Sequence, residues 1–125
     1  MKYYDPLRPP DPEQWRSIDA QERILLVENY HRRARIRLPK ATVHAVVHVI
    51  VENQIALGYE TPVRRTVQRL ISEGLDRHES IHAVGSVLAS HVNDLLRGPD
   101  PGAEPISSYY VALDHLTAKD WLRSG

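Results

Sequence analysis

The stretch that decides the fold is HAVVHVIVENQ, residues 44–54, in which two histidines and a glutamate interrupt a run that is otherwise almost wholly apolar. The run extends from Ala41 to Leu57 without Pro or Gly, and Gly58 follows it. A segment of this length is long for a strand and normal for a helix, although its valines also favour strands. Because the segment is apolar almost all round, we predict that residues 41–57 form a central, buried helix.

Helical patterns also cover most of the chain on either side. Thr61–Pro62 and Asp76, which is followed three residues later by Glu79, are typical helix starts. The other predicted helices span residues 12–35, 62–73, 76–97, 107–116 and 117–123. No segment shows a strand pattern. The predicted fold class is therefore all-α, a compact bundle of four main helices plus two short C-terminal helices.

The first predicted helix, residues 12–35, carries an apolar stripe at helical spacing, which consists of Trp15, Ile18, Leu25 and Leu26. Glu22 lies among these apolar residues, which is an unusual place for a carboxylate. His31 is expected on the opposite side of the helix, where it would face water.

The chain has 125 residues, which predicts a single helical domain over 1–125. Residues 1–12 contain four prolines and are predicted to form an extended arm that lies on the body through Tyr3 and Tyr4. The segment GPDPGAEP, residues 98–105, is the predicted linker to the short C-terminal helices.

The composition argues against several classes of function. Sixteen Lys and Arg residues balance sixteen Asp and Glu residues, so no net charge attracts nucleic acid or an anionic membrane. The absence of Cys excludes disulfides, thiolate metal sites and cysteine nucleophiles. The N-terminus lacks an apolar signal segment, and the apolar run at 43–51 is too short to span a bilayer. We expect a cytoplasmic protein without a membrane partner, and interpret the basic run at 31–40 as a solvated face rather than a nucleic-acid surface.

Two pairs of histidines carry the functional signal. His44 and His48 lie four residues apart, as do His78 and His82, so each pair shares one face of its helix. Each imidazole is costly to bury alone, so we predict that the two pairs meet inside the bundle.

Neutral imidazole is a common metal ligand, and two of them at this spacing can bind one ion. The predicted ligands are His44, His48, His78 and His82, with Glu52 and Glu22 adding oxygen atoms. This nitrogen and oxygen set without sulfur is typical of a divalent ion such as zinc, iron, nickel or manganese. In a catalytic site of this kind, hydrolysis by metal-activated water is the general expectation.

Other interpretations stay open. The histidines can instead form a structural hydrogen-bond network or a metal-free acid–base site. In the first case the protein is a helical adaptor that docks a partner through its arm, its basic face or Tyr109 and Tyr110. A ferritin-type carboxylate site built on ENYH (28–31) and ESIH (79–82) is less favoured. An almost wholly apolar helix in so short a chain also suggests a homodimer that covers it.

The two histidine-bearing helices resemble each other in sequence. TVHAVVHVIVENQIAL at 42–57 aligns with SIHAVGSVLASHVNDL at 80–95, which places His44 and His82 at related positions and favours their facing each other. Gly85 interrupts the second helix, where a glycine costs about 1 kcal/mol. Close approach of the helix over 41–57 is the predicted compensation.

These motifs carry a family resemblance. HAVVHVIVENQIA followed by GLDRHESIHA resembles a bacterial family catalogued as domain of unknown function eighteen forty-one. The matching positions are His44, His48, Gln54, Asp76, His78 and His82. The acid that directly precedes the glutamine in that family is Asn53 here, with Glu52 one residue earlier. The resemblance implies a small soluble helical protein of bacterial type and brings no established activity.

Overall fold

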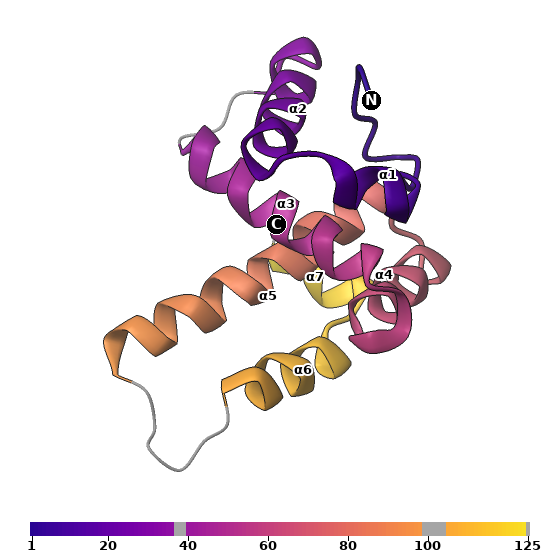
Figure 1. Cartoon of the computed structure of the whole chain (residues 1–125). Coiled ribbons are helices and arrows are strands. Elements are labelled where there is room, and N and C mark those ends of the chain that lie inside the picture. The colour runs from indigo at the N-terminus through magenta and orange to yellow at the C-terminus, as the bar shows by residue number, and fades with distance from the viewer. Residues whose placement is uncertain (37–39, 99–104, 125) are drawn as a thin grey trace.

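Helix α3 (Ala41–Ala56) is the central element of this all-helical chain, as predicted, and the other helices are arranged around it (Figure 1). The computed structural model describes residues 1–36, 40–98 and 105–124. Its other elements are α1 (Pro12–Ser17), α2 (Ala20–Arg33), the 3-10 turn η1 (Gly58–Glu60), α4 (Val63–Ser72), α5 (Arg77–Arg97), α6 (Pro105–His115) and α7 (Ala118–Ser124). No strand occurs within these ranges, which confirms the all-α class. No helix in the described part of the chain is both long and apolar enough to cross a membrane.

The segment predicted as one helix over 12–35 is two helices, so the predicted count of main and short helices is not exact. Ile18 has an extended backbone, with φ −82° and ψ 136°, and this ends α1. Asp19 then caps α2, because its carboxylate accepts a hydrogen bond from the Gln21 amide at 3.2 Å. The break resets the helical phase, so Leu25 is 51% exposed whereas Val27 is buried.

The other boundaries lie close to the predicted ones. Asp76 caps α5 by accepting a hydrogen bond from the Glu79 amide at 2.7 Å. Gly58 and Gly74 follow α3 and α4 with positive φ angles of 69° and 114°, a conformation that favours glycine at helix ends. Of the predicted linker, residues 99–104 lie outside the described ranges.

Two apolar clusters pack on different faces of α3. Val51 and Ile55 belong to a cluster shared with α4, α5, α6 and α7, whereas Ala45 and Val49 belong to one shared with the N-terminal arm, α1 and α2. At about 100° per residue, His48 lies between these two faces, whereas His44 points in the same direction as Val51 and Ile55. His48 is therefore at the boundary between the two halves of the core.

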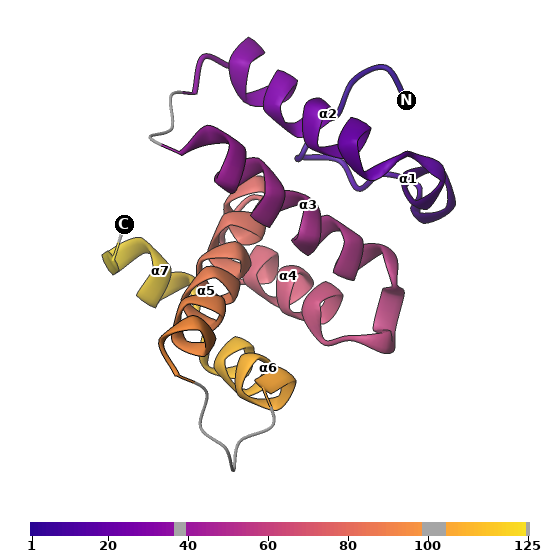
Figure 2. The same cartoon turned by 60° about the vertical axis from the view of Figure 1, so that its left-hand side comes forward.

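Helices α3 and α5 approach each other closely at Gly85. A Cβ atom added to this glycine would lie 3.1 Å from Val47 Cγ1 and 3.9 Å from Val51 Cγ2. The predicted close approach is thus confirmed, and its partner is the predicted helix. Figure 2 shows α2 running alongside α3 while α5 crosses it, and the far end of α5 leaves α3 to lie beside α6.

The N-terminal arm lies on the body, as predicted, but chiefly through one of its two tyrosines. Tyr4 is 2% exposed and Pro6 is fully buried, whereas Tyr3 is 68% exposed and has the Arg33 guanidinium 4.5 Å from its ring centre. Residues that precede the first helix therefore contribute side chains to the interior.

Candidate metal centre

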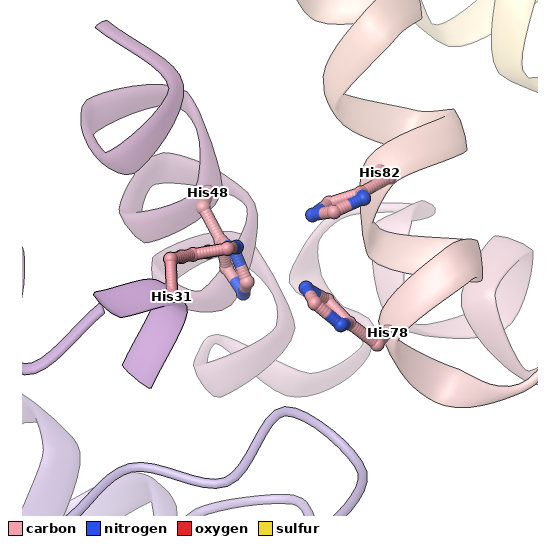
Figure 3. A group of neighbouring side chains, drawn as sticks. All are labelled: His31, His48, His78 and His82. Atoms are coloured by element: carbon pink, nitrogen blue, oxygen red, sulfur yellow. The ribbon is translucent and has the colours of Figure 1, made fainter. Parts of the chain in front are cut away.

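Histidines from three helices converge at one interior point. His31 of α2, His48 of α3 and the α5 residues His78 and His82 each offer a ring nitrogen, and these four nitrogens lie within 4.8 Å of one another. Figure 3 shows the four rings directed toward a common space, with His31 and His48 on one side and the two α5 histidines on the other. The expectation that the two histidine pairs meet inside the bundle is confirmed.

His31 is the member of this group that the sequence prediction placed wrongly. It was expected to face water, but its side chain is 5% exposed and lies near the ring centres of His44 at 4.9 Å and His78 at 5.3 Å. The prediction treated residues 12–35 as one helix. It therefore extended the apolar stripe of α1 past the break at Asp19 into α2, where the stripe lies on a different face. Within α2 alone, the spacing Ile24, Val27 and His31 marks the buried face, and that signal was available in the sequence.

The outer nitrogens of His31 and His48 are hydrogen-bonded, which assigns the tautomers of both rings. His31 Nδ1–H donates to the Val27 carbonyl at 2.9 Å. Tyr4 donates its hydroxyl proton to the Glu52 carboxylate, so the Tyr4 oxygen accepts from His48 Nε2–H, 2.7 Å away. Each ring is therefore left with a lone pair on its other nitrogen, as in metal sites where a second group orients each ligand.

Those other nitrogens have no partner. His31 Nε2, His48 Nδ1 and His78 Nε2 are buried atoms without a hydrogen bond among the described residues. A buried polar atom left unpaired costs about 1–3 kcal/mol. Unpaired ring nitrogens on three residues of one cluster are donors of the kind that a metal ion binds.

Glu52 lies behind the histidines rather than among the ligand atoms. Arg77 Nη1 and Nη2 donate to its two oxygens at 2.7 and 2.8 Å, and Tyr4 donates to it as well. Arg77 Nη1 also donates to the Pro6 carbonyl at 3.0 Å, which ties the arm to α5. The prediction of Glu52 as a metal ligand is therefore corrected: its carboxylate orients Tyr4, and Tyr4 orients His48.

Glu22 is not near the cluster. Its side chain is exposed in the first turn of α2, nine residues before His31. At 1.5 Å of rise per residue, that separation places it about 13 Å away along the helix axis. The Glu79 carboxylate of the alternative ferritin-type pattern accepts a hydrogen bond from Trp121 Nε1 at 2.7 Å, so it too points elsewhere.

The environment disfavours the charged forms of His48, His78 and His82. Burial, followed by repulsion from neighbouring imidazoles, lowers the pKa of His78 to about 4 and that of His82 to about 3. The same causes lower the pKa of His48 well below its usual 6.5. Neutral rings at pH 7 are the form that ligates metals.

His44 lies outside the group of four, unlike His48, which follows it by four residues on α3. It is half-buried, and its Nε2 shares a hydrogen bond with His82 Nε2 at 3.0 Å, so the two histidines of the internal sequence likeness do face each other. His44 is absent from the group of four mutually close nitrogens. It instead lines a pocket of about 350 Å³ together with His48 and His82.

Two further residues of the site were missed by sequence reasoning. Tyr4 was expected only to touch the body, and Arg77 was not singled out. Arg77 follows the cap residue Asp76 and precedes His78, and a cation in the first turn opposes the helix dipole, which is a weak sign of a specific partner. For Tyr4 no local signal existed, because its partners lie 44 and 48 residues along the chain.

Comparison of the chain with protein-family models, with curated proteins and with solved structures gives no match. The functional argument therefore depends on the geometry of the cluster.

Proposed function

We propose that this protein binds one divalent transition-metal ion through ring nitrogens of His31, His48, His78 and His82. The observation that carries the proposal is the convergence of one ring nitrogen from each of these histidines within 4.8 Å, in a cluster where three of the four residues have a buried, unpaired ring nitrogen. His31 and His48 would ligate through Nε2 and Nδ1, since their other nitrogens are engaged. Tyr4, Glu52 and Arg77 hold the His48 ring in place.

The rival interpretation is an adaptor module in which the histidines form a structural hydrogen-bond network. Such a network would pair the buried nitrogens with one another or with the backbone. His31 Nε2, His48 Nδ1 and His78 Nε2 lack such pairs, which favours the metal. The other ring nitrogens of His31 and His48 do have partners, of the kind that orient histidine ligands in metal sites.

The donor set narrows the choice of ion. With both carboxylates outside the ligand group, four imidazole nitrogens remain, and these suit zinc, iron or nickel better than manganese, which prefers oxygen. A divalent ion in such a site acts as a Lewis acid toward a molecule that reaches it. The histidine-lined pocket gives small molecules a route to this place.

The test is a metal titration of the purified 125-residue chain after treatment with a chelator. We expect one Zn²⁺ or Co²⁺ per chain by calorimetry and elemental analysis. His31→Ala should weaken the affinity by about 100-fold or more, because it removes a ligand from a site whose outer-shell losses alone cost about 10–100-fold. His115→Ala is the matched control, since His115 is an exposed histidine on α6 outside the cluster.

Circular dichroism of both variants separates a lost ligand from a lost fold. Failure of the wild-type chain to take up any stoichiometric ion near pH 7 would overturn the proposal. Equal affinities for the wild type and His31→Ala would also overturn the assigned ligand set.

A further inference from the structure

The pocket beside the histidine cluster combines an apolar wall with histidines. It holds about 350 Å³, at the lower end of the roughly 300–1,000 Å³ of small-molecule sites. Its apolar wall includes Val43 and Val47 of α3, Ile81 of α5 and the Trp121 ring of α7. His48 and His82 belong both to this lining and to the four-nitrogen group, so the pocket adjoins the proposed ion.

Charge is the second relevant feature. Among the described residues, those that line the pocket include no Asp, Glu, Lys or Arg. The nearby Glu52 is already paired with Arg77, and an imidazole that ligates a metal ion is itself uncharged. A divalent ion held by neutral imidazoles therefore keeps its two positive charges, and a buried charge without a counter-charge is costly.

We propose that this pocket binds a small organic anion, such as a monocarboxylate, with its charged head at the ion and a compact apolar body against Val43, Val47 and Ile81. This inference rests on the proposed metal site. The apolar wall favours a ligand with an apolar body, because contact with it removes apolar surface from water. The uncompensated positive charge of the ion favours a negatively charged head group. His44, beside the ion's ligand His82 at the pocket wall, is placed to hydrogen-bond the head group.

The inference predicts that neither half of the ligand is sufficient. Benzoate combines an apolar ring with a carboxylate, acetate has the carboxylate without the ring, and benzyl alcohol has the ring without the charge. With the chain saturated with Co²⁺, we expect benzoate to bind at least about tenfold more tightly than acetate, because burial of its ring removes apolar surface from water. Benzyl alcohol should bind more weakly than benzoate, and metal-free protein should bind benzoate at least tenfold more weakly than the loaded protein.

The measurements are calorimetry and the visible absorption of Co²⁺, which changes when a new ligand reaches the ion. Val43→Trp places a large ring at the pocket wall and should lower benzoate affinity by about tenfold, a loss of the order that overpacking causes. Val111→Trp is the matched control, because Val111 on α6 is 55% exposed, close to the 58% of Val43, and does not line the pocket. It should leave benzoate affinity unchanged.

The two proposals fail in different ways. If the chain takes up Co²⁺ but binds benzoate no better than acetate, or if Val43→Trp has no effect on benzoate, the pocket inference is overturned and the metal site stands. Equal benzoate affinity with and without the ion also overturns it. If no ion binds in the first titration, the proposed function itself fails before benzoate is added.

Discussion

At the scale of single residues, His31 has a buried polar atom that the fold itself leaves without a hydrogen bond, and this lowers the stability of the fold. One of its nitrogens is bonded to the Val27 carbonyl, while the other is buried without a partner. An apolar side chain of similar volume would avoid the cost of that unpaired atom. The residue is therefore better explained by ligand binding than by the stability of the metal-free fold.

We predict that His31→Leu leaves the stability of the metal-free protein unchanged or raises it by about 1 kcal/mol, since it removes a buried unpaired nitrogen and keeps most of the volume. Added Zn²⁺ should raise the stability of the wild type but much less that of the variant. Urea unfolding with and without Zn²⁺ measures both quantities. A metal-free variant that is several kcal/mol less stable than the wild type would indicate a structural role for His31.

Tyr4 and Tyr3 are adjacent residues with different roles, which makes them a matched pair. The Tyr4 hydroxyl lies between His48 and Glu52, whereas Tyr3 is mostly exposed. Tyr4→Phe should lower metal affinity by about 10–100-fold, because the His48 ring loses the acceptor that orients it. Tyr3→Phe should leave the affinity unchanged.

Metal titration of the two phenylalanine variants measures this difference, and circular dichroism checks the fold. Equal metal affinities in the two variants would show that the hydrogen bonds from Arg77 through Glu52 and Tyr4 to His48 do not affect metal binding.

At the scale of elements, the site depends on how closely α5 approaches α3. Their histidines meet because Gly85 lets the two backbones come together opposite Val47 and Val51. The break between α1 and α2 has a comparable effect, since it turns the face of α2 that carries His31 toward the same point. Relations between helices, rather than any one helix, bring the proposed ligands together.

Gly85→Val should destabilise the protein by about 1–3 kcal/mol and weaken metal binding, because its side chain would press on Val47 and separate the helices. Ser90→Val is the control, because it introduces the same side chain on the exposed side of the same helix. It should reduce the stability less than Gly85→Val does. Adding Val47→Ala to Gly85→Val should restore part of the metal affinity, because it makes room at the contact.

Thermal unfolding and metal titration of the single and double variants measure these effects. If Val47→Ala restores nothing, the contact does not limit the approach of the two helices.

At the scale of the whole molecule, the buried imidazoles make the metal-free protein sensitive to acid. The folded-state pKa is about 4 for His78 and about 3 for His82, against a usual 6.5 for an exposed imidazole. Between those folded values and 6.5 the unfolded chain binds more protons than the folded one, so stability rises with pH in this window and is lost as pH falls. Above pH 6.5 these rings are neutral in both states, so they do not make the free energy of unfolding depend on pH.

We predict that the urea midpoint of the metal-free protein falls steadily as pH is lowered from 6.5 to 4. His82→Gln should make this dependence shallower, because it removes one such imidazole, whereas His115→Gln at an exposed position should leave it unchanged. Urea titrations at several pH values measure the slopes. Identical slopes in all three proteins would contradict the neutral state of His82 in the fold.

The sequence by itself determined those features that depend on one helix at a time. The four-residue spacing placed each histidine pair on one face, the length of 41–57 identified the buried helix, and Asp76 marked the start of α5. These features follow from helical periodicity and capping, which act over only a few residues. The predicted homodimer and cytoplasmic location depend on surroundings beyond one chain and stay predictions.

Only the tertiary structure decided which side chains surround the cluster. It brought in His31 and Tyr4, moved Glu52 behind His48, left Glu22 in solvent and placed His44 at the pocket. Periodicity is lost at a helix break, so the phase of α2 could not be carried over from α1. The contacts of Tyr4 join residues more than 40 positions apart, and packing of the whole chain is what brings such residues together.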